Sequence, residues 1–249
     1  MGKQFLDGTP PKIAFFLGLF LGVTVCVVVG FLLMNKTGTT TSGANNVANN
    51  GGTVAGDTAG NHAGDSAPAD VAPINDQDHI RGDVDAPITL VEYSDYECTF
   101  CGRFHPTAQQ IIDEYPGQVR WVYRHFPLTS IHAQARSSSI AAECVAREKG
   151  ENAFHSFTDV MFNNQAGLGR SLYVQEATKL GVSQSTFETC LDNEETAAKV
   201  DADYQSGIAA GVNGTPGNFI IAEDGEVVAI PGAQPFEVVK SVVDQLLGL

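Results

Sequence analysis

The sequence predicts an α/β domain with a central mixed sheet flanked by helices, preceded by an apolar segment and a polar linker. Three observations lead to this prediction. Apolar runs typical of strands alternate with segments of helical periodicity, in the order strand, helix, strand, helical block, helix, hairpin, helix. A C-x-x-C motif stands at the first strand-to-helix junction, and the composition changes sharply near residues 35 and 79. With 249 residues, of which 43% are hydrophobic, the chain can form a substantial core.

Residues 13–34 carry no charge and have the length of a membrane-spanning helix. At about 1.5 Å per residue, such a helix crosses a hydrocarbon core of about 30 Å. A cleavable signal peptide is the alternative, but its apolar region usually has only about 7 to 15 residues, with a small-residue cleavage site close behind. Here the nearest such site is at residues 42–44. Lys3 and Lys12 precede the segment and only Lys36 follows it closely, so we expect residues 1–12 in the cytoplasm and the C-terminal domain outside.

Residues 35–78 are expected to form a disordered linker between this transmembrane anchor and the domain. They are rich in Thr, Gly, Asn, Ala and Asp and cannot bury enough apolar surface to offset their ordering entropy. A flexible chain of this length has an r.m.s. reach of about 35 to 40 Å. We interpret His62 and His79 as solvated residues of this segment rather than as ligands.

The charge of the chain argues against a nucleic-acid partner. The sequence has 29 acidic and 14 basic residues, which gives a formal net charge of −15. An acidic surface repels the phosphate backbone, whereas proteins that bind nucleic acids carry basic patches.

The C-x-x-C motif, Cys98 to Cys101, follows a predicted buried strand at residues 88–93 and begins a predicted helix. The free N–H groups and the dipole of a helix N-terminus favour an anion, so Cys98 should ionise readily. A thiolate is the form that attacks disulfides. Half of a zinc site is the alternative, but no second C-x-x-C exists, and haem attachment requires His where this chain has Gly102.

The remaining elements follow from periodicity and from turn signals. A second strand is predicted at residues 118–126 and a hairpin at residues 218–222 and 226–230, around Asp224-Gly225. Helices are predicted at residues 132–148, 152–162 and 171–180, from Ser183 onward, and at 194–210 and 236–247.

These motifs resemble those of the thioredoxin superfamily and, more narrowly, of the DsbA-like and BdbD-like thiol-disulfide oxidoreductases of bacterial envelopes. The resemblance covers residues 79–249. It rests on Asp85-Ala86-Pro87, on residues 91–98, 126–128 and 141–144, and on Val212-Asn213-Gly214-Thr215-Pro216. It implies a thioredoxin-like fold with a helical insertion at about residues 128–193. We expect no metal and no cofactor.

The resemblance also implies roles for single residues. Cys98 would be the nucleophile, Cys101 the buried resolving thiol, and Pro216 a cis-proline that faces the disulfide. An ordinary trans turn proline is the alternative for Pro216. Glu92 matches a buried acid that could relay the proton of Cys101, although an acid at the sheet edge is also compatible with the sequence.

Residues around the cysteine pair are expected to contact substrate and to tune the reactivity of the two cysteines. The backbone of Thr215 would face an incoming peptide, beside Phe100 and Thr99. Many relatives have proline where this chain has Thr99, and this dipeptide tunes the balance of thiolate and disulfide. Glu97 would raise the pKa of Cys98 if its carboxylate stays close.

The other cysteines are Cys26, an ordinary apolar residue of the anchor, and Cys144 and Cys190. Cys144 and Cys190 form an even set outside the motif, and together with an oxidising compartment this predicts a structural disulfide between them. Two separate buried thiols are the alternative.

The predicted function is that of a membrane-anchored dithiol oxidase that introduces disulfides into secreted or envelope polypeptides. A reductase or isomerase that uses the same cysteines is the alternative, and a redox-inert peptide-binding module is a third class. The resemblance implies reoxidation by a quinone-linked membrane partner of the DsbB or vitamin K epoxide reductase type.

Overall fold

The computed structural model describes residues 70–249. None of the helices within this range combines the length and the apolar character that a membrane crossing requires. The predicted anchor at residues 13–34 and most of the predicted linker lie outside the described residues, so both stay predictions.

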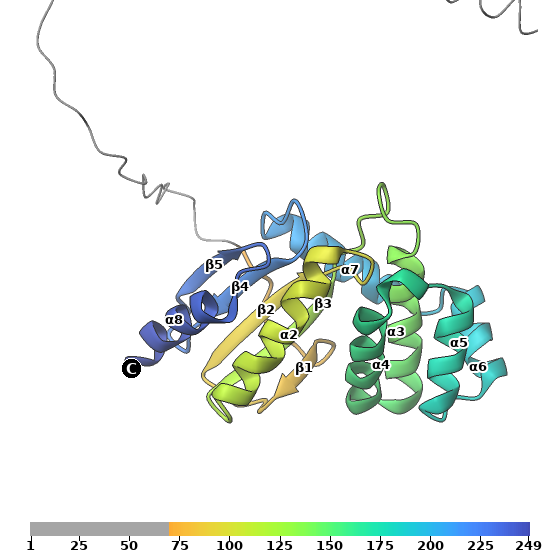
Figure 1. The fold of residues 1–249 in the computed structure, drawn as a ribbon, viewed down its shortest axis with the longest axis horizontal. Helices are drawn as coiled ribbons and strands as arrows, with labels where there is room; N and C mark the ends of the chain where they lie inside the picture. Colours follow the sequence, from red (N-terminus) through yellow and green to blue (C-terminus); the bar gives the residue numbers. More distant parts are fainter. Residues whose placement is uncertain (1–69) are drawn as a thin grey trace, which may run out of the picture. The chain divides into compact units, whose positions relative to one another are not determined.

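A five-stranded mixed sheet forms the centre of the domain, with the strand order β1-β3-β2-β4-β5 (Figure 1). The strands are β1 (His79–Gly82), β2 (Ile88–Ser94), β3 (Val119–His125), β4 (Gly217–Ile221) and β5 (Val227–Pro231). Only β2 and β3 run parallel, and the other neighbours are antiparallel. The chain between β2 and β3 forms α2 (Thr99–Glu114), as a parallel crossover requires. The predicted α/β fold with an antiparallel end is therefore confirmed.

The alternation of side chains along β2 separates two hydrophobic cores. Leu90 belongs to the larger core, shared with α2 and α8 (Phe236–Leu247), whereas Val91 belongs to the smaller core against α7 (Ala197–Ala209). Figure 1 shows α2 and α8 on the same face of the sheet. Successive side chains of a strand point to opposite faces, so Glu92 lies on the same face as Leu90, beneath the C-x-x-C helix.

Helix α7 approaches the opposite face of the sheet closely because it carries a glycine there. A Cβ atom at Gly207 would lie 2.6 Å from Cδ2 of Phe126 and 2.9 Å from Cδ1 of Tyr93. Any side chain at this position would therefore push the helix away from the sheet.

The predicted helical insertion forms a group beside the sheet (Figure 1). It consists of α3 (Ala135–Lys149), α4 (Glu151–Asn163), the short 3-10 helix η1 (Gln165–Gly167), α5 (Arg170–Lys179) and α6 (Gln184–Asp192). Ser183 caps α6 as predicted, since its hydroxyl accepts a hydrogen bond from the Thr186 N–H at 3.2 Å. A disulfide joins Cys144 of α3 to Cys190 of α6.

Helix α3 begins three residues later than predicted, at Ala135 rather than at His132. The preceding loop is held by Asp95, whose carboxylate accepts hydrogen bonds from the Leu128 N–H at 2.9 Å and from Nδ1 of His132 at 2.7 Å. This buried carboxylate, directly after β2, holds residues 128 and 132 in the turns that precede α3.

The packed part of the chain includes residues that were expected in the linker. Val71 and Ile74 pack against the smaller core. The buried Arg124 donates to both carboxylate oxygens of Asp78, at 2.8 and 2.9 Å, and to the carbonyl oxygens of residues 72 and 73. The interpretation of His79 as a solvated residue is wrong, because it begins β1 and is only 4% exposed.

Candidate active site

The two cysteines of the motif lie at the start of α2. Cys98 is the N-cap residue of the helix, and Cys101 lies in its first turn. Both carry free thiols in this structure. Cys98 is 5% exposed and Cys101 is completely buried, so the expected difference in exposure is small. The difference between the two thiols is mainly electrostatic.

The pKa values of the two thiols are shifted in opposite directions. The Cys101 thiol donates a hydrogen bond to the Cys98 sulfur, which outweighs burial and lowers the pKa of Cys98 to about 5. Backbone N–H groups of Phe100 and Cys101 contribute in the same direction. Burial raises the pKa of Cys101 well above its ordinary value, and the charges of Glu92 and Cys98 raise it further. At neutral pH, Cys98 is a thiolate and Cys101 a thiol.

The carboxylate next to the motif does not reverse this shift. Glu97 accepts a hydrogen bond from the Gln134 N–H at 2.6 Å, which ties it to the segment before α3. The pKa of Cys98 is lowered despite this neighbour. The net shift is therefore opposite to the one that Glu97 alone would produce.

The loop between α7 and β4 also contacts Cys98, through Thr215. The Thr215–Pro216 peptide bond is cis, so the trans alternative does not hold in this structure. The carbonyl oxygen of Thr215 lies 3.4 Å from Sγ of Cys98. On the helix, Phe100 is 55% exposed and Thr99 is also exposed. The three residues expected to contact substrate therefore lie beside Cys98, Thr99 and Phe100 directly after it in the chain and Thr215 across from it.

Glu92 lies on the sheet beneath the helix and is completely buried, so it is not an acid at the sheet edge. Oε1 accepts a hydrogen bond from Oγ of Ser94 at 2.7 Å, whereas Oε2 has no partner among the described residues. Burial raises the pKa of Glu92 to about 8. A carboxyl group with this pKa, next to a buried thiol, can accept or return a proton near neutral pH.

Replacing Glu92 by glutamine should make the protein more stable at pH 7. Folding raises the pKa of Glu92 by burial from 4.5 to about 8, so between these values the folded protein binds more protons than the unfolded chain. Wild-type stability therefore falls as the pH rises through this window. Glutamine removes that loss, which reaches roughly 3 kcal/mol at pH 7 as an upper figure. Denaturant unfolding at pH 5 and pH 7, with the thiols reduced, measures the difference.

The matched control is Glu226→Gln, which changes an exposed carboxylate in the β4–β5 turn and should leave the pH dependence as in wild type. A Glu92→Gln protein with wild-type stability at both pH values would contradict the prediction. The Glu92→Gln protein should also resolve mixed disulfides more slowly than wild type, because the proton acceptor for Cys101 is lost.

Gln165 of η1 also holds the active-site loop, a contact that the sequence does not indicate. Its Nε2 donates hydrogen bonds to the carbonyl oxygens of Tyr96 and Cys98, both at 2.8 Å. A Cβ atom at Gly102 would lie 2.4 Å from Oε1 of Gln165. The glycine directly after the motif was the only local signal of this approach, and it does not identify the partner.

A family model described as thioredoxin, Thioredoxin_4, matches residues 74–245. The chain belongs to this thioredoxin family. Within the superfamily it is DsbA-like, as solved structures show. It is 28% identical to Pseudomonas aeruginosa DsbA2, with a TM-score of 0.57, covering 68% of this chain and 94% of that one. It is 23% identical to oxidised BdbD from Bacillus subtilis, with a TM-score of 0.59, and the match covers 70% of this chain and 94% of that one. The chain is 24% identical to Wolbachia pipientis α-DsbA1, with a TM-score of 0.61, and the match covers 71% of this chain and 93% of that one.

Curated proteins with a similar segment are much longer than this thioredoxin-family chain. It is 33% identical over 145 residues to a protein named Na(+)/H(+) antiporter NhaA 3 from Salinispora tropica, and 31% identical to NhaA 1 from Salinispora arenicola. These matches cover 58% of this chain but only 22% of each relative. The activities of those whole proteins therefore do not transfer to it.

Proposed function

We propose that this DsbA-like protein is a thiol-disulfide oxidoreductase that acts outside the cytoplasm and introduces disulfides into secreted or envelope polypeptides. The observation that carries the proposal is the asymmetry of the cysteine pair. A stabilised Cys98 thiolate favours the reduced enzyme, and an enzyme whose reduced form is stabilised is an oxidant.

The reaction proceeds in two exchanges. A client thiolate attacks Sγ of Cys98 in the Cys98–Cys101 disulfide, the S–S bond breaks, and Cys101 leaves with the electron pair. Cys101 then takes a proton, for which Glu92 is the nearby buried acid. A second client thiolate attacks the client sulfur of the mixed disulfide and releases Cys98 as a thiolate. Two electrons thus pass from the client dithiol to the enzyme; one proton ends on Cys101 and the other goes to solvent, because Cys98 stays a thiolate.

The reduced enzyme needs an electron acceptor to turn over again. We propose a quinone-linked membrane oxidase of the DsbB or vitamin K epoxide reductase type as this partner, because the resemblance to envelope oxidoreductases implies it. The third class, a redox-inert peptide-binding module, would leave the opposed pKa shifts of the two thiols without a purpose.

The equilibrium reduction potential decides between an oxidase and a reductase or isomerase. The pKa of Cys98, about 5, lies between the nucleophilic thiols of thioredoxin, about 7, and DsbA, about 3.5. We expect a potential between their values, about −270 and −120 mV. Equilibration in glutathione buffers, followed by alkylation and mass spectrometry, measures it.

A potential at or below that of thioredoxin, together with efficient reduction of client disulfides, would favour the reductase. Thr99→Pro is an informative companion variant, because it changes only the dipeptide at the first helical position, where proline is tolerated. A shift of its potential without loss of stability would show that the dipeptide tunes the enzyme.

We also propose that residues 13–34 anchor the chain as a single-pass segment, with the catalytic domain on the outer side. Full-length protein should stay with membranes after a carbonate wash, and protease added to intact spheroplasts should digest the domain. A chain that lacks residues 1–34 should be released when it is exported by a separate signal. Recovery of a mature protein that begins near residue 45, free of membranes, would exclude the anchor.

A further inference from the structure

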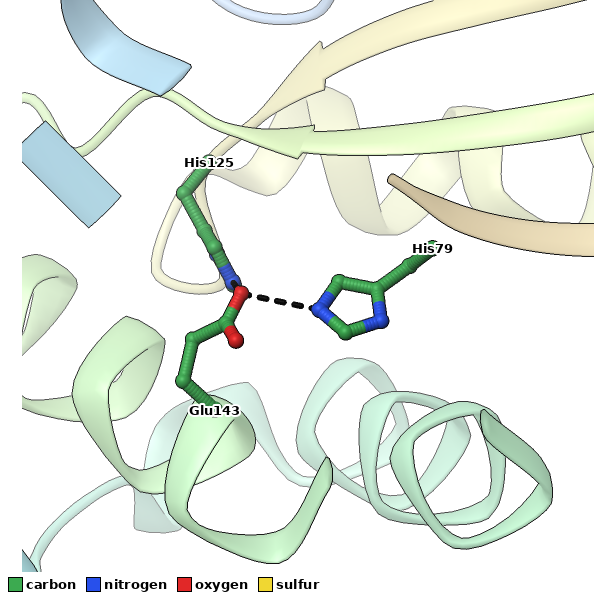
Figure 2. Close-up of side chains that lie close together, drawn as sticks. All are labelled: His79, His125 and Glu143. Carbon is green, nitrogen blue, oxygen red and sulfur yellow. Dashed lines mark hydrogen bonds and ion pairs between the residues drawn. The ribbon is translucent and has the colours of Figure 1, made fainter. Parts of the chain in front are cut away.

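A second cluster of chemically active side chains is buried between the sheet and the helical insertion (Figure 2). His79 comes from β1, His125 from the end of β3 and Glu143 from α3. Oε1 of Glu143 lies 2.8 Å from Nε2 of His79 and 3.0 Å from Nε2 of His125. One ligand atom of each residue lies within 4.8 Å of the other two. The redox mechanism uses none of these three residues.

The donor set suits a transition-metal ion. Two imidazole nitrogens and one carboxylate oxygen bind Zn²⁺ at about 2.0 to 2.2 Å, which places tetrahedral ligand atoms roughly 3.3 to 3.5 Å apart. The present separations of 2.8 and 3.0 Å are only a few tenths of an ångström shorter. Small side-chain movements would therefore open a three-ligand site.

The surroundings of His79 fix its ring in the orientation that a ligand needs. Its other nitrogen, Nδ1, lies 2.9 Å from Oε1 of Glu151. A carboxylate on the far nitrogen is the usual outer partner of a metal-binding histidine. The ring also stacks on Phe154, with centroids 3.5 Å apart and planes 10° apart.

The charge of the cluster favours a cation. The carboxylates of Glu143 and Glu151 both lie within hydrogen-bond distance of the His79 ring, at 2.8 and 2.9 Å. The two carboxylates thus create a strong negative field in a buried site. Nδ1 of His125 is buried and has no partner within residues 70–249, so hydrogen bonds leave the second imidazole only partly satisfied.

We propose that His79, His125 and Glu143 form a binding site for a divalent transition-metal ion of the zinc class, with Glu151 orienting His79. The ion would link two strands of the sheet, β1 and β3, to α3 of the insertion. This inference is independent of the proposed redox function.

The test uses the full chain in mild detergent, with the Cys98–Cys101 pair oxidised so that its thiols cannot bind metal. Calorimetric titration with Zn²⁺ should give one ion per chain. Affinity should fall at least about 100-fold in Glu143→Gln and in His79→Gln, since each removes a direct ligand, and outer partners alone contribute about 10- to 100-fold. The matched control is His105→Gln, which removes a buried histidine whose Nε2 pairs with Asp159 at 2.8 Å.

A measurement on the wild type keeps the test decisive if the variants do not fold. In protein with ¹⁵N-labelled histidine rings, Zn²⁺ should shift two of the six ring systems, those of His79 and His125. Absence of Zn²⁺ binding by the oxidised wild type would overturn the proposal. Unchanged affinity in both folded ligand variants, or ring shifts confined to other histidines, would overturn it equally.

Discussion

Replacing Cys101 by alanine should trap client polypeptides on Cys98 as mixed disulfides. The Cys98 thiolate, with its pKa near 5, still attacks a client disulfide and releases a client thiolate. The internal thiol that would break the mixed disulfide is gone, so the adduct accumulates. Turnover in dithiol oxidation should fall by roughly a thousand-fold or more, because the enzyme has lost its reactive disulfide. Gel electrophoresis with and without reductant, followed by mass spectrometry, measures the adducts.

Cys98→Ser is the matched variant, and it should form almost no adducts. Its remaining thiol, Cys101, is completely buried and has a pKa raised well above the ordinary value. Equal adduct yields on the two cysteines would show that the assignment of nucleophile and resolving thiol is incorrect. Client oxidation that persists in Cys98→Ser would point to a different reactive site.

Removing the second disulfide should destabilise the protein by about 4 kcal/mol. The bond joins Cys144 to Cys190 across a sequence separation of 46 residues, and the chain-entropy model gives this figure for a loop of that length. Both side chains are completely buried, so alanine at both positions also loses packing. Denaturant unfolding of the Cys144→Ala/Cys190→Ala protein measures the change.

The control for this experiment is wild type in which only the Cys98–Cys101 pair is reduced. The comparison then measures the effect of the Cys144–Cys190 disulfide alone. Peptide mapping without reductant gives a separate check, because it should recover the two cysteines in one linked peptide pair. A shift below about 1 kcal/mol, or recovery of both positions as alkylated thiols, would count against a structural role.

The strand, motif and helix around Cys98 could be predicted from the sequence because they are contiguous and strongly patterned. The apolar run of β2, the cysteine spacing and the helical periodicity of α2 are local signals. Helix α8 was predicted with its observed bounds, Phe236–Leu247, for the same reason. Local patterns of this kind do not depend on which other elements pack nearby.

Some features that depend on distant partners could not be predicted. Strand β1 has only four residues, and it is a strand because it pairs with β3. That pairing, together with α3, brings His79 next to His125 and Glu143, which are 46 and 64 residues away from it in the chain by their numbers. The sequence shows each of them only as an isolated polar residue.

Gln165 connects the catalytic loop, which follows β2 of the sheet, to the helical insertion. Its single amide group holds two carbonyl oxygens of the loop that carries Cys98, while its backbone belongs to the insertion between α4 and α5. The backbone conformation around Cys98 therefore depends on the helical insertion as well as on the sheet. A chimaera that exchanges this insertion with that of a relative would keep the loop in place only if the donor segment also supplies an amide to both carbonyls.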